Sequence, residues 1–206
     1  MISQIVEKRI CPVVVLDRVE DAEPLADALL AGGLNVMEVT FRTDAAAACI
    51  EYIAKHRPEI IVGAGTLLRP EQVQRAKDSG ATFGLAPGLN PRVLERAAEI
   101  GLPFSPGVMT PTDIEEALEL GCDLLKFFPA GAAGGPKTLK ALSGPYAHTG
   151  VKFIPTGGIN RSNMREYLDL SVVAAIGGSW MVESTLIIEK RWEEITWLTR
   201  EALAAV

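Results

Sequence analysis

Short runs of β-branched and other apolar residues alternate with helical patterns from one end of the chain to the other. The apolar runs predict buried strands, because strands covered by helices on both faces read as near-continuous hydrophobic segments. These runs lie at residues 10–16, 34–41, 60–65, 82–86, 102–106, 124–128, 151–155 and 172–176. The segments between and after them predict helices near 21–31, 44–57, 70–80, 91–100, 112–121, 137–142, 161–170 and 187–205.

Helix-terminating residues support this division of the chain. Pro58 and the glycines Gly80, Gly101 and Gly121 each follow a helical pattern, where such residues commonly end helices. Thr112 and Glu115 have the spacing of a capping box, which predicts the start of a helix. The last pattern predicts a long amphipathic helix that closes the chain.

Eight strand-helix units without a linker or low-complexity segment predict a single (β/α)8 TIM barrel. The expected domain covers residues 1–206, with a short N-terminal helix and a long C-terminal helix. An open doubly wound sheet is the alternative. Two observations argue against such a sheet: it usually needs fewer than eight strand-helix units, and the glycine-rich fingerprint of a dinucleotide site does not follow the first strand.

Composition and charge exclude several classes of protein. With 206 residues, of which 48% are hydrophobic, the chain can bury one sizeable core. The net charge of -6, without a basic run, argues against a nucleic-acid partner or an anionic membrane surface. Cys11, Cys49 and Cys122 are odd in number and far apart, which is typical of reduced thiols in a cytoplasmic protein. His56 and His148 lie far from any ligand-like cluster, so we expect no metal site.

One charged residue, Lys126, interrupts the apolar run 124–128. An ammonium taken out of water tends to lose its proton, and the neutral amine of a buried lysine is a nucleophile. The alternative is a lysine on an edge strand whose amine extends to solvent. This run alone does not separate the two.

Strand alternation gives Lys126 a possible partner. The two-residue period of the second strand places Glu38 and Arg42 on one face, with Met37 and Val39 on the other. If the apolar face packs on helices, Glu38 points into the barrel, as Lys126 does from the sixth strand. A buried amine beside a carboxylate suits Schiff-base chemistry, because the amine attacks a keto carbon and the acid moves protons. A structural ion pair of Glu38 with Arg42 is the alternative.

The ends of the strands show where a barrel would place its chemistry, which is at their C-terminal side. Lys152 lies near the N-terminal end of the seventh strand, so we expect it on the opposite, structural side. Paired glycines with a neighbouring hydroxyl occur at Thr156-Gly157-Gly158 and at Gly177-Gly178-Ser179. Backbone N–H groups in these two places bind phosphate in many barrels. Tight turns without a ligand are the alternative.

Six motifs together resemble the 2-keto-3-deoxy-6-phosphogluconate (KDPG) aldolase family, whose bifunctional members also cleave 4-hydroxy-2-oxoglutarate (KHG). They occur in order over nearly the whole chain. The motifs are Glu38-Val39-Thr40-Phe41-Arg42-Thr43, Val62-Gly63-Ala64-Gly65-Thr66, Pro87-Gly88, Lys126-Phe127-Phe128-Pro129-Ala130, Pro155-Thr156-Gly157-Gly158-Ile159 and Ile176-Gly177-Gly178-Ser179-Trp180.

The resemblance implies a class I aldolase without a cofactor, usually a homotrimer, with a 2-oxo acid sugar phosphate as its small-molecule substrate. It would cleave 2-dehydro-3-deoxy-6-phosphogluconate to pyruvate and glyceraldehyde 3-phosphate, and KHG to pyruvate and glyoxylate. Lys126 would be the Schiff-base lysine and Glu38 the general acid/base. By the same resemblance, Arg42 and Thr66 would bind the carboxylate, Pro87 and Thr156 the substrate, and Gly157, Gly158, Gly178 and Ser179 the phosphate.

Two other functions stay open at this point. The substrate can be the galactonate epimer, because the sequence carries no information on the configuration at C4. The chain can also be a non-catalytic phosphosugar-binding barrel, in which Lys126 and Glu38 form only a buried ion pair.

Overall fold

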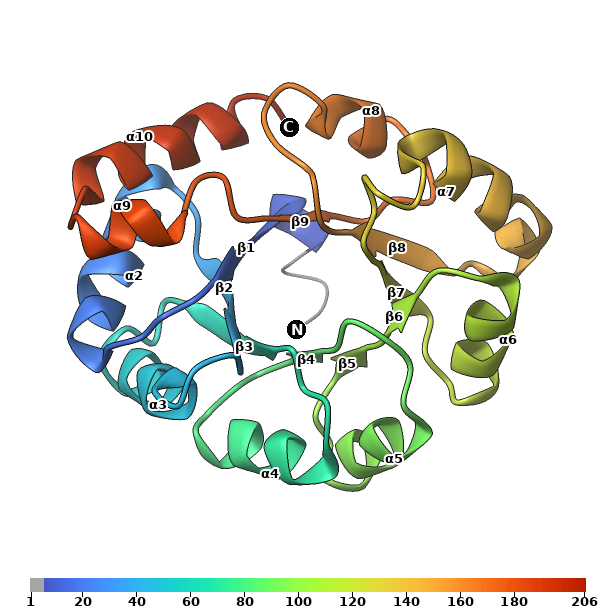
Figure 1. Cartoon of the computed structure of the whole chain (residues 1–206), viewed down its shortest axis with the longest axis horizontal. Coiled ribbons are helices and arrows are strands. Elements are labelled where there is room, and N and C mark those ends of the chain that lie inside the picture. Colours follow the sequence, from blue (N-terminus) through green and yellow to red (C-terminus); the bar gives the residue numbers. More distant parts are fainter. Residues whose placement is uncertain (1–5) are drawn as a thin grey trace.

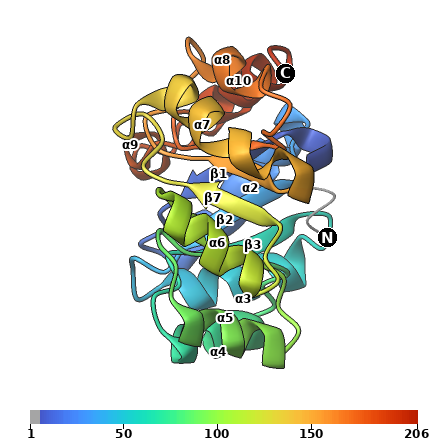
Figure 2. The same ribbon diagram turned by 90° about the vertical axis from the view of Figure 1, so that its right-hand side faces the viewer.

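The structure is a computed structural model that describes residues 6–206. Strands form a ring at the centre and helices surround it (Figure 1). From the side, α4 and α5 lie at one end of the view and α8 and α10 at the other, with strands between them (Figure 2). The strands are β1 Ile10–Val14, β2 Val36–Thr40, β3 Ile61–Gly65, β4 Gly84–Leu85, β5 Phe104–Ser105, β6 Gly107–Val108, β7 Leu124–Phe127, β8 Lys152–Pro155 and β9 Ile176–Gly178.

Helical segments follow the strands, as the alternating pattern predicts. They are η1 Val19–Asp21, α2 Ala22–Gly32, α3 Ala46–His56, α4 Pro70–Asp78, α5 Pro91–Glu99, α6 Pro111–Glu119, α7 Gly135–Ser143, η2 Gly144–Thr149, α8 Met164–Leu168, α9 Ser184–Ile188 and α10 Trp192–Leu203. Residues 6–8 are also helical, and the beginning of the expected N-terminal helix lies outside the described residues.

Parallel pairing closes the strands into a barrel. The strands pair in the orders β5-β4-β3-β2-β1-β9 and β6-β7-β8. β5 and β6 are two parts of one barrel strand, interrupted at Pro106 because proline has no N–H for the ladder. Isolated parallel bridges from Phe153 to Val173 and from Thr156 to Gly177 join β8 to β9. The predicted (β/α)8 barrel is confirmed, and the open doubly wound sheet is wrong.

The eighth barrel strand lies later in the chain than predicted. Within the apolar run 172–176, Val173 makes only an isolated bridge, and β9 spans Ile176–Gly178. The register with β1 pairs Ile10 with Ile176 and Pro12 with Gly178. The glycines expected in a turn after this strand therefore form its carboxyl end.

Helix α6 has a different cap from the one predicted. Thr110 is the N-cap residue: its Oγ1 accepts a hydrogen bond from the Asp113 N–H at 3.2 Å. The Asp113 carboxylate accepts one in return from the Thr110 N–H at 2.9 Å. The predicted box of Thr112 and Glu115 is wrong, because Pro111 occupies the first helical position, where a missing N–H costs nothing.

The predicted long C-terminal helix is divided into α9 and α10. Lys190, which follows the C-cap residue Glu189 of α9, has a φ of 55°, in the left-handed region. Its N–H donates to Ile187 O at 3.0 Å, and the Arg191 N–H donates to Leu186 O at 2.8 Å. These two bonds form a Schellman motif, which ends a helix. The expectation of one continuous helix is therefore wrong.

Helix α10, near the end of the chain, packs against α2, near its beginning (Figure 1). The Thr196 hydroxyl donates to Ala28 O at 3.0 Å, and the Arg200 guanidinium donates to Ala31 O at 2.9 Å. The helices approach closely at Gly32, where a Cβ would lie 2.6 Å from Thr199. Within residues 6–206, the helices are too short or too polar to cross a membrane.

Candidate active site

A buried ion pair lies inside the barrel between β7 and β2. Nζ of Lys126 lies 3.0 Å from Oε1 and 3.4 Å from Oε2 of Glu38. The two residues are only 4% and 1% exposed. The inward orientation predicted for both side chains is confirmed, and the alternative of a lysine that extends to solvent is wrong. The partner of Glu38 is Lys126, so the alternative pair with Arg42 is wrong as well.

Two glycines of β3 make room for neighbouring side chains, and Gly65 does so for this pair. Gly63 is in register with Glu38, and Gly65 is in register with Thr40. A Cβ on Gly65 would collide with the Glu38 carboxylate, and one on Gly63 would collide with the ring of Phe83. The carboxylate therefore leans over β3 at a position where only glycine leaves enough space.

Other residues of the barrel strands are buried or close to the pair, although the sequence assigned them no role. Val13 of β1 is in register with Glu38, and the ring centroid of Phe128 lies 5.8 Å from Nζ of Lys126. Ser105 of β5 is buried, and its Oγ has no hydrogen-bond partner within the described part of the chain. The only signal for these residues in the sequence was strand alternation, which predicts the face of the strand on which a side chain lies but not its function.

Cys11 is also close enough to the pair to respond to its charges. Burial raises the pKa of the Cys11 thiol, the negative charge of Glu38 raises it further, and the positive charge of Lys126 opposes both effects. The thiol therefore stays protonated and acts as an apolar part of the barrel wall. All three cysteines are free thiols, as predicted.

A small hollow brings together the residues predicted to bind phosphate. Its volume is about 150 Å³, and it lies at the carboxyl ends of β8 and β9. Gly157 and Gly158 have φ values of 95° and 75°, which favour glycine and turn the backbone at the end of β8. Phe128 forms part of the wall and connects this hollow to the lysine strand. The residues that line it are Val13, Phe128, Thr156, Gly157, Gly158, Ile159, Gly178 and Ser179.

The other predicted binding residues lie around the same end of the barrel but do not share one hollow. Arg42 is exposed and lines a hollow of about 320 Å³ together with Ser179. Thr66 follows β3 with a φ of 59°, a strained conformation for a β-branched residue. Pro87 lines a third hollow, of about 330 Å³, which also includes Phe128. Arg42 and Thr66, which the resemblance assigns to the substrate carboxylate, therefore do not line one of these hollows together.

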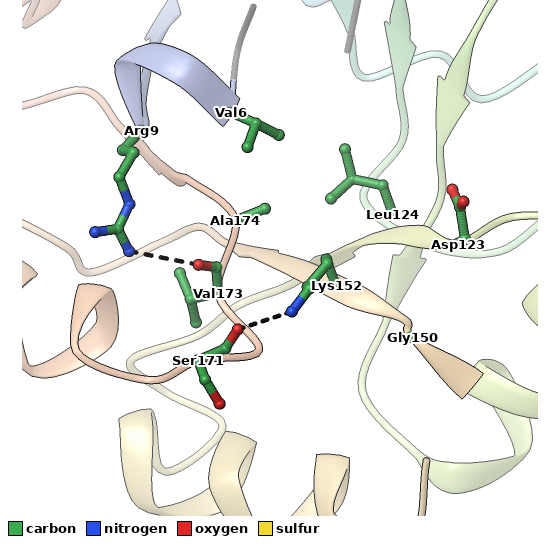
Figure 3. A pocket seen from close by; sticks show the side chains of 9 residues that line it. All are labelled: Val6, Arg9, Asp123, Leu124, Gly150, Lys152, Ser171, Val173 and Ala174. Carbon is green, nitrogen blue, oxygen red and sulfur yellow. Dashed lines mark hydrogen bonds between the residues drawn. The ribbon is translucent and has the colours of Figure 1, made fainter. Parts of the chain in front are cut away.

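Lys152 lies at the opposite end of the barrel, as predicted. It is exposed, and its Nζ donates to Ser171 O at 3.0 Å. Figure 3 shows it in a cavity of about 550 Å³, larger than the three hollows above, with Arg9 and Asp123 on opposite sides of it. Cavity size therefore does not locate the buried lysine and carboxylate. Within residues 6–206, His, Cys, Asp and Glu side chains form no group of three or more that could hold a metal ion.

A family model for aldolases, described as KDPG and KHG aldolase, matches residues 1–198. The chain belongs to the KDPG and KHG aldolase family. The resemblance carried by the six sequence motifs is confirmed.

Relatives in this family match the chain over nearly its whole length. The chain is 47% identical to the 2-dehydro-3-deoxy-phosphogluconate aldolase of Haemophilus influenzae, over 98% of this chain and 96% of the relative. It is 44% identical to the KHG/KDPG aldolase of Escherichia coli K12, over 94% of this chain and 90% of the relative. The KDPG aldolase of Legionella pneumophila has a similar structure, with a TM-score of 0.92 and 41% identity, over 96% of this chain and 95% of that chain. That crystal structure contains pyruvate captured at low pH as a covalent carbinolamine intermediate.

Proposed function

We propose that this member of the KDPG and KHG aldolase family is a lyase that cleaves KDPG to pyruvate and glyceraldehyde 3-phosphate, and KHG to pyruvate and glyoxylate. The observation that carries the proposal is the buried contact of 3.0 Å between Nζ of Lys126 and Oε1 of Glu38. It supplies an amine that can attack a carbonyl carbon and an acid/base within proton-transfer distance. The names of the relatives from Haemophilus influenzae and Escherichia coli support the substrates.

The reaction begins when the amine of Lys126, after transfer of its proton to Glu38, adds to the C2 carbonyl carbon of the substrate. The resulting carbinolamine loses water, with Glu38 supplying the proton, and becomes a protonated imine. Glu38 then accepts the proton of the C4 hydroxyl group, directly or through a water molecule. The C3–C4 bond breaks, its electron pair flows into the imine, and the aldehyde leaves.

Lys126 then carries the enamine of pyruvate. Protonation of the enamine at C3 and addition of water to the imine carbon release pyruvate and regenerate the free amine. The imine acts as the electron sink, so the reaction needs no cofactor. Carbon–carbon bond cleavage is therefore accomplished by residues of the chain alone.

The remaining roles follow the strand ends. Arg42 can hold a carboxylate with two parallel hydrogen bonds, and Thr66, whose hydroxyl would add another, directly follows the neighbouring strand β3. Pro87 and Thr156 line the substrate. Gly157, Gly158, Gly178 and Ser179 bind the phosphate in the hollow that these residues share, through backbone N–H groups at the ends of β8 and β9.

The assembly and location form part of the same proposal. Residues 1–206 would make one barrel domain, three copies of which form a homotrimer in the cytoplasm. Size-exclusion chromatography with light scattering measures the number of copies directly. A monomer in solution at micromolar concentration would contradict the trimer without affecting the chemistry of the site.

Trapping with borohydride tests whether Lys126 forms a Schiff base with pyruvate. Incubation with pyruvate and reduction should attach a stable adduct to Lys126, which mass spectrometry of peptides can locate. Lys126→Arg should abolish the adduct, whereas Lys152→Arg, the matched control, should form it normally. No adduct on the unaltered protein would favour the non-catalytic phosphosugar-binding barrel, and an adduct on Lys152 would move the reaction to the other end of the barrel.

Catalytic efficiency on four compounds tests the substrates. We expect the phosphorylated gluconate substrate to be cleaved more efficiently than its unphosphorylated form and than the galactonate epimer, with measurable activity on KHG. Equal efficiency with and without the phosphate would remove the proposed phosphate role. A preference for the galactonate epimer would replace the proposed main substrate.

A further inference from the structure

The chain folds back on itself immediately after β9, so that Trp180 packs against Gly178. A Cβ built on Gly178 would collide with the indole ring of Trp180. A turn in which the Val182 N–H donates to Ser179 O at 3.0 Å reverses the chain at this point. The indole ring therefore occupies the space that a side chain of residue 178 would need.

Strand alternation places this contact on the outer side of the barrel. A Cβ on Gly177 would collide with Thr156, whose side chain also lines the hollow at the end of β8. Neighbouring residues of a strand point to opposite faces, so the missing side chain of Gly178 faces away from that hollow. Trp180 supports the carboxyl end of β9 from behind, while Ser179 lines the hollow in front.

The contact is made by the ring of Trp180 rather than by its polar group. Nε1 is buried and has no hydrogen-bond partner within the described residues. An unpaired buried N–H opposes folding, so packing of the ring outweighs this cost. The indole fills volume behind Gly178 that a smaller side chain would leave empty.

We infer that Trp180 is a positioning residue for phosphate binding: its ring holds the carboxyl end of β9 at Gly178, so that the N–H group of the following residue, Ser179, points into the hollow. The N–H of Gly178 itself belongs to the ladder with β1, where Gly178 is paired with Pro12. The inference rests on the proposed function, in which this hollow binds the phosphate of the substrate. Backbone donors bind an anion well only when they are already oriented, because the ligand then does not have to order them. Trp180 itself does not touch the ligand.

Titration with glycerol 3-phosphate, followed by nitrogen–proton correlation NMR, tests the inference without depending on catalysis. In the unaltered protein, the amide signal of Ser179 should shift on binding. Trp180→Leu should weaken binding about tenfold, below the roughly hundredfold loss that a 1 Å misplacement can cause. Trp180→Phe, which keeps an aromatic ring, should bind almost normally. Trp197→Leu, which alters an exposed tryptophan on α10, is the matched control.

A substitution at Gly178 provides the complementary test. Gly178→Ala places a Cβ against the indole ring and should also weaken phosphate binding. In the double variant Gly178→Ala/Trp180→Leu the collision is relieved, so its binding should be no weaker than that of Trp180→Leu alone. Additive losses would mean that the two positions act independently and would overturn the inference. If the leucine variants do not fold, unchanged binding by Gly178→Ala overturns it.

Kinetics separates positioning from a general effect on folding. Trp180→Leu should raise KM for the phosphorylated substrate about tenfold at nearly constant kcat, as expected when binding energy common to substrate and transition state is lost. Its kcat/KM for KHG, which has no phosphate, should stay unchanged. Equal losses on both substrates, or no shift of the Ser179 signal in the unaltered protein, would overturn the inference. A chain that binds glycerol 3-phosphate but cleaves neither substrate would contradict the proposed function alone.

Discussion

The buried pair of Lys126 and Glu38 has a consequence for stability that does not depend on catalysis. In Lys126→Met, an apolar side chain of similar length leaves the carboxylate buried without its partner. Removing one member of a buried pair typically destabilises a protein by about 3–5 kcal/mol. The 3.0 Å separation indicates a similar scale, because two unit charges at this distance attract by about 5–6 kcal/mol at an effective dielectric constant of about 20.

Protonation limits the cost and makes it depend on pH. Protonating a glutamate takes about 4 kcal/mol at pH 7 and about 1 kcal/mol at pH 5. We therefore expect Lys126→Met to lose about 3–4 kcal/mol at pH 7 and about 1 kcal/mol at pH 5. The loss grows as the pH rises, because the unfolded chain releases the proton that the buried carboxyl group must keep.

Urea unfolding followed by circular dichroism at the two pH values measures these losses, at one protein concentration throughout. A loss of 3–4 kcal/mol corresponds to a fall in Tm of about 10 °C for a chain of this size. The matched control is Lys126→Met/Glu38→Gln, which removes both charges and should recover most of the stability. Equal losses at pH 5 and pH 7, or a double variant no more stable than Lys126→Met, would refute this electrostatic reasoning.

Three further outcomes follow from local geometry. Gly65→Ala should lower kcat at least tenfold and the free energy of unfolding by about 1–3 kcal/mol, because its Cβ displaces the buried carboxylate of Glu38. The control Gly144→Ala, which has open space around it, should retain full activity. Thr110→Ala should lower the free energy of unfolding by about 1 kcal/mol through loss of the α6 cap, and Thr112→Ala by less than half as much; equal losses would contradict the assignment of the cap. Burial raises the pKa of Cys49 to about 11, so its thiol should resist alkylation at pH 8 and react on unfolding; rapid labelling of the folded protein at pH 8 would contradict this. Because the unfolded chain releases the thiol proton at a lower pH than the folded chain, the free energy of unfolding should fall as the pH rises from 9 to 11.

Much of the fold was predictable from local patterns. Apolar runs identified the barrel strands because each is covered by helices on one side and by other strands on the other. The errors occurred where a single hydrogen bond, or the register of one strand pair, decides at which of several neighbouring residues a helix or strand begins or ends. Pro111 moved the start of α6 to a cap at Thr110, and the left-handed Lys190 ended α9 inside a continuous amphipathic pattern.

The site was predictable in part for the same reason. Lys126 interrupts an apolar run, and Glu38 occupies the inward face of an alternating strand, so both are visible in the sequence as misplaced charges. Trp180 gave no such signal, because a tryptophan among apolar residues is read as part of the core. Its contact with Gly178 depends on a chain reversal after β9.

The sequence by itself determined most of the segments that form strands and helices, which face of each strand is apolar, and which residue types end the strands. These properties are local, and they depend on periodicity and on backbone preferences. Tertiary structure alone decided that Lys126 and Glu38, 88 positions apart, lie in hydrogen-bond contact, that Gly65 leaves space for their pair, and that Lys152 lies at the other end. The physical reason is that the register of closed strands sets these distances, and register is a property of the whole barrel.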